Sequence, residues 1–142
     1  MSVSHFRELE VWRLAMGLAR DVYALTAGFP REERYGLSAQ LQRAAVSVPS
    51  NIAEGNARAS TRDYARCVSL ACGSIAELQT QLLLSIDLGL GDADRARAAL
   101  EDAERVSKML HGLHRSLCDR ADARSPVPGP RSRISELSED YA

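Results

Sequence analysis

The chain has 142 residues, a length that suits one domain with its own hydrophobic core and leaves little room for a second full domain. Its 39 alanine and leucine residues outnumber its 15 Val, Ile and Thr residues, which favours helices and argues against an all-β fold. The 18 basic residues, 17 of them arginine, and the 19 acidic residues leave a formal charge of -1. This balance argues against a globally basic nucleic-acid-binding protein.

Signals for membrane insertion, secretion and disulfide bonding are weak in this sequence. The most apolar run, residues 82–90, contains Ser85 and Asp87 and is shorter than the about 18 apolar residues that a membrane helix needs. The N-terminal segment lacks the apolar core of a secretory signal. The three cysteines are an odd number and form no CxxC pair, which argues against a disulfide framework or a zinc knuckle. We therefore expect a cytoplasmic protein with no membrane partner.

Two helices are predicted in the first half of the chain. Apolar residues recur at three- and four-residue spacing over residues 6–27, and Gly28 and Pro30 are expected to end this helix, the glycine in the left-handed conformation. The same spacing predicts a second helix over residues 33–58. Pro49 lies inside the second helix. Because proline lacks a backbone donor and crowds the preceding turn, we expect a kink there rather than an end.

Two longer helices are predicted in the second half. Ser60 is expected to cap the third helix, and Gly89 is expected to close it. Asp92 is expected to cap the fourth helix, which ends near Asp119. In both helices the apolar positions alternate in steps of four and three, the spacing of a bundle interface. Short connections favour antiparallel neighbours, so the sequence predicts an all-α fold, an antiparallel up-down-up-down four-helix bundle.

The composition changes after this bundle, which we assign to residues 1–119. Residues 120–142 contain three of the five prolines, carry no apolar periodicity and have equal numbers of basic and acidic side chains. This composition predicts a disordered C-terminal tail rather than a basic arm.

The motifs of known active sites are missing from the sequence. It contains no Walker loop, dinucleotide-binding fingerprint or nucleophile elbow. His111, His114 and Cys118 are spaced to share one side of the fourth helix, but no carboxylate joins them at ligand spacing. The Glu-x-x-His pairs of di-iron bundles are absent as well. We therefore predict that the chain is not an enzyme and has no catalytic residue, metal site or cofactor.

A polar stripe runs along the second predicted helix, opposite its apolar face, and a partly matching stripe runs along the third. The second-helix stripe consists of Gln40, Arg43, Ser47, Asn51, Glu54 and Arg58. The third-helix stripe consists of Arg62, Arg66, Ser69, Gly73, Glu77 and Gln81. A solvated face would explain both stripes, but such faces are usually richer in Glu and Lys, whereas Ser, Asn and Gly suit a buried polar or subunit interface.

Four arginines near the junction of the second and third helices are candidates for contacts with nucleic-acid phosphates, because arginine binds phosphate through paired hydrogen bonds. They are Arg43, Arg58, Arg62 and Arg66. Between residues 31 and 66 the basic residues exceed the acidic ones by only two, so this basic footprint is weak.

Several segments carry a family resemblance that extends over residues 6–118. They are YGL at 35–37, QLQRAA at 40–45, SVPSNIAEG at 47–55 and GSIAELQTQLLL at 73–84. The chain resembles the four-helix-bundle proteins encoded within intervening sequences of bacterial 23S ribosomal RNA genes. This resemblance implies a helical bundle that assembles into a homopentameric ring, with no established enzymatic activity. The residues of the shared motif to which it gives a structural or interface role are Gln40, Arg43, Ser47, Pro49, Asn51, Glu54 and Glu77.

Two hypotheses remain for the function of the assembled bundle. Related bundles serve as accessory proteins to the reverse transcriptase of diversity-generating retroelements and bind nucleic acid through a strongly basic ring surface. The net charge of -1 departs from that pattern. The first hypothesis is a noncatalytic homo-oligomer that accompanies structured RNA, a ribonucleoprotein or a nucleic-acid-processing protein. The alternative is a protein-protein scaffold or oligomeric adaptor that binds no nucleic acid.

Overall fold

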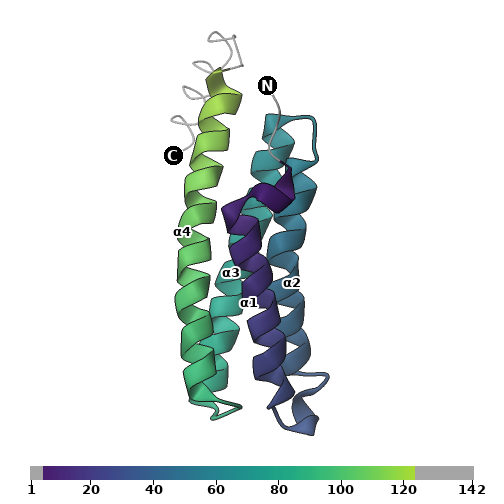
Figure 1. Cartoon of the computed structure of the whole chain (residues 1–142), viewed down its shortest axis with the longest axis vertical. Helices are drawn as coiled ribbons and strands as arrows, with labels where there is room; N and C mark the ends of the chain where they lie inside the picture. The colour runs from purple at the N-terminus through teal and green to yellow at the C-terminus, as the bar shows by residue number, and fades with distance from the viewer. Residues whose placement is uncertain (1–4, 124–142) are drawn as a thin grey trace, which may run out of the picture.

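The computed structural model describes residues 5–123, which form four long helices and two short 3-10 turns (Figure 1). The elements are η1 (Phe6–Glu8), α1 (Glu10–Ala27), η2 (Arg31–Glu33), α2 (Leu37–Asn56), α3 (Thr61–Asp87) and α4 (Ala93–Ala123). The α1–α2 and α3–α4 connections lie at one end of the molecule, and the α2–α3 connection lies at the other (Figure 1). Consecutive helices are therefore antiparallel, and the predicted all-α four-helix bundle is confirmed.

Helix α1 begins later than predicted because the chain breaks at Leu9. Leu9 is extended, with φ -73° and ψ 125°, so residues 6–8 form the separate turn η1 before α1 begins. The break brings the ring of Phe6 edge-on to that of Trp12, with the ring centroids 5.3 Å apart. At its other end α1 stops at Gly28, whose φ is -88°. Our prediction that this glycine adopts the left-handed conformation is therefore wrong.

Helix α2 also begins later than predicted, at Leu37 instead of residue 33. Residues 31–33 form η2, and Gly36 has φ -105° and ψ -116°, which no helix continues. The Glu33 carboxylate accepts a hydrogen bond from the Leu37 backbone N–H at 3.2 Å and so satisfies a donor in the first turn. The helix continues through Pro49 to Asn56, and the kink at this proline stays a prediction.

The predicted starts of α3 and α4 are confirmed by their capping hydrogen bonds. The Ser60 Oγ accepts a hydrogen bond from the Asp63 N–H, and the Asp92 Oδ1 accepts one from the Asp94 N–H at 2.9 Å. Gly89 and Gly91 between the helices both have φ of 68°, a conformation that favours glycine. Helix α4 runs to Ala123, past the predicted end near Asp119, so the first residues assigned to the tail are helical. The remaining tail residues lie outside the described part of the chain.

The core is a continuous set of aliphatic side chains to which all four helices contribute. Helix α3 packs against both α2 and α4, and α1 packs against the same two helices. Each helix contributes fully buried side chains to the core, among them Leu18, Leu41, Ile75 and Leu110. Most of the apolar positions predicted from the four-three spacing of α3 and α4 are buried, whereas Tyr64 and Leu113 in these series are half-buried.

One described helix, α3, is long and apolar enough to meet the length and composition criteria for crossing a membrane. The core helices of soluble proteins meet the same criteria, so this is weak evidence for a membrane span. Its apolar residues include Val68, Ile75 and Leu82, which are fully buried in the bundle core.

Candidate functional site

The polar stripes of α2 and α3 meet in a seam of hydrogen bonds between the two helices. The Ser47 Oγ lies 2.7 Å from the Ser74 Oγ, which joins the helices directly. The Asn51 side-chain amide donates to the Ser47 backbone carbonyl at 2.8 Å and to the Ser47 Oγ at 3.0 Å. All three side chains are half-buried. The stripe therefore lies along a helix contact rather than on a fully solvated face, as its Ser and Asn content suggested.

Contacts on both sides of this seam define the register between α2 and α3. A Cβ added to Gly55 would lie 2.8 Å from the Cys67 Cβ, so α2 and α3 approach closely at these residues. Together with the Ser47–Ser74 contact, this antiparallel register places Gln40 at the level of Gln81. The Gln81 side chain is only 6% exposed, and its Nε2 donates to the Glu77 carboxylate at 3.2 Å. Its Oε1 is buried without a hydrogen-bond partner among the described residues.

Gly73 lies beside this seam on the outer face of α3. It is exposed, and a Cβ built on it would meet no heavy atom within 4 Å. A glycine inside a helix weakens it by about 0.5–1 kcal/mol relative to alanine. Packing within one chain therefore does not explain Gly73, in contrast to Gly55.

The structure brings three of the four candidate arginines together and leaves the fourth apart. Arg58, Arg62 and Arg66 lie within one short stretch around the α2–α3 connection, where Asp63 is the one acidic residue between positions 57 and 67. Arg62 also lines a shallow pocket there with Ala121 of α4. Arg43 is fifteen residues before Arg58 on the chain, which places it about 20 Å away along the helix axis.

These arginines have different electrostatic surroundings. The Arg58 guanidinium donates to the Glu54 carboxylate at 2.6 Å, one turn earlier. This hydrogen bond, with the charge of Glu54, raises the pKa of Arg58 above its ordinary value. The Arg43 and Arg66 side chains are exposed, and no ion pair to either is found among residues 5–123.

Pro49 belongs to the family motif but lies on the other side of α2. Its side chain is buried and faces α1, whereas Ser47 and Asn51 face α3. The motif SVPSNIAEG is therefore divided between two helix contacts. The sequence stripe placed Gln40, Glu54 and Glu77 near the seam, and of these Glu77 takes part through its hydrogen bond with Gln81.

Sequence analysis missed Ser74 as a member of this seam. Ser74 is seven residues from both Cys67 and Gln81, so all three lie on the side of α3 that faces α2. This heptad spacing was the available signal. The stripe chosen on α3 instead contained Ser69 and Gly73, which are exposed.

The histidines and cysteines near the fourth helix form two separate pairs. The Cys72 Sγ lies 3.9 Å from the His111 Nδ1, and the Cys118 Sγ lies 3.7 Å from the His114 Nε2. Partial burial raises the pKa of the Cys72 thiol above its ordinary value. In the described part of the chain, no group of three or more His, Cys, Asp or Glu side chains is arranged to hold a metal ion.

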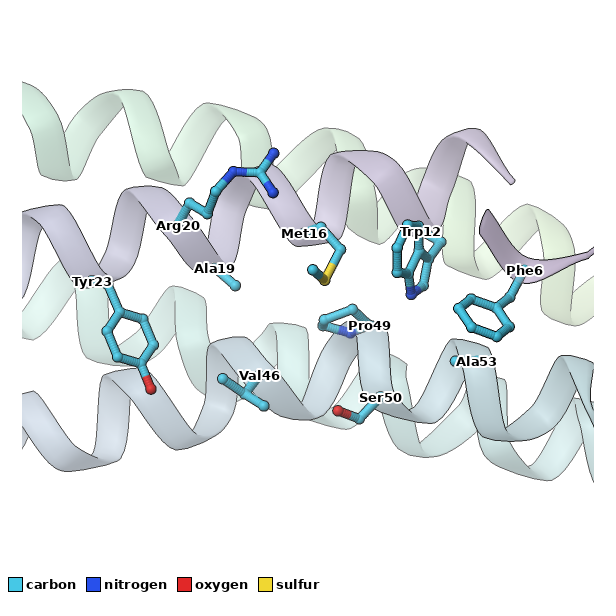
Figure 2. A pocket seen from close by; sticks show the side chains of 10 residues that line it. All are labelled: Phe6, Trp12, Met16, Ala19, Arg20, Tyr23, Val46, Pro49, Ser50 and Ala53. Carbon is cyan, nitrogen blue, oxygen red and sulfur yellow. The ribbon is translucent and has the colours of Figure 1, made fainter. Parts of the chain in front are cut away.

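An apolar groove of about 520 Å³ runs between α1 and α2 (Figure 2). The side chains that form most of its wall are Phe6, Trp12, Met16, Tyr23, Val46 and Pro49. Tyr23 is 51% exposed and Val46 is 42% exposed, so the groove opens to solvent. Trp12 and Met16 are among the apolar residues whose spacing predicted the first helix, but that spacing did not identify an open groove.

Comparison with known proteins identifies a family and a fold. The family described as "23S rRNA-intervening sequence protein" matches residues 7–112 of the chain. A crystal structure of a protein with unknown function from the S23 ribosomal protein family of Bacteroides thetaiotaomicron is similar, with a TM-score of 0.66 and 19% sequence identity. The similarity covers 73% of this chain and 97% of that one. No curated protein matches the chain.

Proposed function

Because the chain belongs to the 23S rRNA-intervening sequence protein family, we propose that it is a noncatalytic, homo-oligomeric bundle that accompanies structured RNA in the cytoplasm. The observation that carries this proposal is the group formed by Arg58, Arg62 and Arg66 at the α2–α3 end of the bundle. Copies assembled as a ring would repeat this group around one rim. Because each copy adds its arginines, the assembled ring would neutralise more phosphates than a single chain does. Its rim would then be locally basic although each chain has a net charge of -1.

Arg66 is the clearest candidate for a phosphate contact within this group. It is exposed and makes no ion pair among the described residues, whereas Arg58 is held by Glu54. Arg62 lies one turn before Arg66, at the spacing that places two side chains on one helix face. Two guanidinium groups at this spacing suit adjacent phosphates of an RNA backbone.

The proposal is tested by measuring how the affinity for an RNA hairpin depends on salt concentration. The full-length protein, with its mass checked by light scattering, is titrated into labelled RNA at low and at rising salt. We expect the double variant Arg62→Ala, Arg66→Ala to bind more weakly and to lower the salt slope by about 0.9 for each phosphate that is no longer neutralised. Arg97→Ala with Arg105→Ala on α4 is the control for the same change in net charge, because both side chains are exposed.

Comparison of the two double variants distinguishes binding through Arg62 and Arg66 from binding that depends only on net charge. Equal reductions in affinity for the two double variants would mean that only net charge matters and would remove these arginines from the site. An assembled protein that binds no RNA at low salt would contradict the proposal as a whole. Thermal melting followed by circular dichroism shows whether each variant keeps its fold.

A protein-protein scaffold is the second candidate, and Gly73 favours it. Exposed glycine with open space around its Cβ position permits close approach by another chain. The half-buried seam beside it supplies Ser and Asn side chains, and the buried Gln81 Oε1 lacks a donor within the described residues. On this proposal, the α2–α3 face closes contacts between subunits, and the ring holds a protein partner.

Assembly of the full-length protein tests the scaffold. We expect Gly73→Gln and Arg43→Ala to lower the mass measured by light scattering while helix content stays the same. Gly112→Gln is the matched control, because a Cβ at Gly112 of α4 also meets nothing within 4 Å. Unchanged mass in Gly73→Gln and Arg43→Ala would contradict a role for this face in assembly.

A further inference from the structure

A pocket of about 470 Å³ lies at the α1–α2 connection, at the end of the bundle opposite Arg58, Arg62 and Arg66 (Figure 1). Its wall is formed by the end of α1, by η2 and by the first turns of α2. The volume is within the range of about 300–1,000 Å³ that small-molecule sites occupy. None of the described residues that line this pocket also lines the apolar groove between α1 and α2.

The charged side chains that line this pocket are arginines. Arg31 and Arg34 are both exposed, and no ion pair to either is found among residues 5–123. The neighbouring Glu32 and Glu33 do not line the pocket. The Glu33 carboxylate instead accepts from the Leu37 backbone N–H. Two guanidinium groups without an acidic partner favour an anionic ligand such as phosphate, which arginine binds through paired hydrogen bonds.

The pocket also has one buried and one exposed aromatic ring. Phe29 is buried, and a Cβ built on Gly91 would lie 2.7 Å from the Phe29 Cε1, so the α3–α4 connection packs closely against this ring. Tyr35 is 88% exposed, and the Arg34 Cζ lies 5.6 Å from its ring centroid. A single exposed aromatic side chain is common on protein surfaces. An exposed ring beside guanidinium groups, however, is the arrangement on which unpaired bases stack in single-stranded nucleic-acid sites.

Two polar side chains of the pocket have hydrogen-bonding capacity that the described residues do not use. Ser38 is only 6% exposed, and its hydroxyl has no hydrogen-bond partner among residues 5–123. The Gln42 Nε2 donates to the buried Thr26 Oγ1 at 3.0 Å, which orients the amide and leaves its Oε1 without a partner in the same part of the chain. Because buried polar groups are normally paired, Ser38 and Gln42 suit the polar edge of a planar ligand.

We propose that this pocket binds a nucleotide, with the base stacked on Tyr35 and the phosphate held by Arg31 and Arg34. The Gln42 amide contacts the edge of the base, because amide side chains form hydrogen bonds with base edges. An unpaired nucleotide of an RNA strand and a free nucleotide present the same ring and phosphate. The RNA source rests on the proposed function, whereas binding of a free nucleotide does not.

Titration of the full-length protein with AMP and with a short oligoadenylate tests the stacking contact. AMP binding is followed by ligand-observed NMR, and binding of the labelled oligoadenylate by anisotropy. Tyr35→Ala should weaken the binding of both probes by about fivefold or more, the effect of losing one stacked base. Tyr35→Phe retains the ring and should bind as the unmodified protein does. Tyr23→Ala is the matched control, because Tyr23 is 51% exposed but lines the apolar groove instead.

Adenosine tests the phosphate contact, because it has the same base without the phosphate. Arg31→Ala should weaken AMP binding by about fivefold and leave adenosine binding unchanged. Arg105→Ala on α4 is the control for net charge, since this side chain is also exposed, and it should change neither affinity. Equal losses for AMP and adenosine in Arg31→Ala would overturn the assignment of the phosphate to this arginine.

The two probes distinguish the two sources of the nucleotide. Equal affinity for AMP and oligoadenylate would support the proposal with a free nucleotide as ligand, and tighter binding of oligoadenylate would support it with an RNA strand. Equal affinity of Tyr35→Ala and the unmodified protein for both probes would overturn the proposal. Thermal melting shows whether each variant keeps its fold.

The arginines at the other end of the bundle separate this inference from the proposed function. If an RNA hairpin binds through Arg62 and Arg66 but neither AMP nor oligoadenylate binds, the nucleotide pocket is overturned and the proposed function stands. If the probes bind through Tyr35 and the hairpin does not depend on Arg62 and Arg66, the pocket is supported and those arginines are removed from the RNA site.

Discussion

The Ser47 and Ser74 hydroxyl oxygens lie 2.7 Å apart and form a direct hydrogen bond between α2 and α3. Asn51 adds a second contact to the same Ser47 oxygen at 3.0 Å. These hydrogen bonds add a specific polar restraint on the register of the two helices to the apolar packing between them. A shift of either helix by one residue would separate the hydroxyl groups and leave half-buried polar atoms unpaired.

Removing either hydroxyl should destabilise the bundle by about 1 kcal/mol. Ser47→Ala should cost more than Ser74→Ala, because the Ser47 oxygen also accepts from Asn51. A double-mutant cycle measured by urea denaturation should show that the two substitutions are not additive, since each removes the same hydrogen bond. Ser69→Ala on the exposed face of α3 is the control and should have little effect. Strictly additive changes in stability would contradict a hydrogen bond between the serines in solution.

Gly55 and Gly73 should respond oppositely to alanine. At Gly55 the new Cβ would lie 2.8 Å from the Cys67 Cβ and 3.2 Å from the Tyr64 backbone carbonyl oxygen, so α2 and α3 must separate. We expect Gly55→Ala to destabilise the fold by about 1–3 kcal/mol. At Gly73 the new Cβ meets nothing within 4 Å, and the higher helix propensity of alanine should add about 0.5–1 kcal/mol.

Urea denaturation of the two glycine variants provides the measurement. Opposite signs would confirm that Gly55 is required by packing inside one chain and Gly73 is not. A loss of stability in Gly73→Ala that depends on protein concentration would indicate that the assembled form requires this glycine. Equal destabilisation at both positions, independent of concentration, would contradict the prediction.

Cys72 should make the stability of the bundle fall at alkaline pH. Partial burial raises the pKa of this thiol, so the unfolded chain releases the proton at a lower pH than the folded chain does. The free energy of unfolding should therefore decrease as the pH rises above the ordinary thiol pKa of about 8.5, while below it the thiol is neutral in both states. Cys72→Ala should remove this part of the pH dependence. A difference in unfolding free energy between the two proteins that is the same at pH 7 and pH 10 would contradict this explanation.

Hydrophobic spacing was sufficient to predict the helices because each of them buries one continuous face. On α3 the apolar positions at this spacing from Val68 to Leu82 are buried, whereas the spacing did not reveal the buried polar residues Gln81 and Ser85. The ends of α1 and α2 were less well predicted because they depend on local contacts. The extended Leu9 and the carboxylate of Glu33, which accepts from the Leu37 N–H, have no signature in the apolar pattern.

The candidate site was only partly predictable for a related reason. A stripe on one helix can be found from its own spacing, and Ser47 and Asn51 were found in this way. The partner residue on α3 depends on the register between two helices, which is determined by the α2–α3 connection and by the close approach of Gly55 to Cys67. The heptad spacing of Cys67, Ser74 and Gln81 shows that these residues share one face of α3, but it does not show which of them meets Ser47, so Ser74 was not recognised.

Glu54 should restrain Arg58 from binding RNA. The Glu54 carboxylate accepts from the Arg58 guanidinium at 2.6 Å, and both side chains are exposed. Glu54→Gln removes the negative charge and makes Arg58 available to a phosphate, so the affinity for an RNA hairpin should rise. One additional phosphate contact should increase the salt slope by about 0.9. The fold should change little in stability, because exposed ion pairs one turn apart contribute little.

Asp94→Asn is the matched control for this prediction. Asp94 accepts from Arg97 at 3.2 Å near the start of α4, at the opposite end of the bundle, and this pair is also exposed. Both variants change the net charge by the same amount, and both leave an arginine without its acidic partner. Anisotropy titrations over a range of salt concentrations should show a steeper slope for Glu54→Gln and no change in slope for Asp94→Asn. The same increase in both variants would show that RNA responds to total charge, and the α2–α3 end would then hold no specific phosphate site.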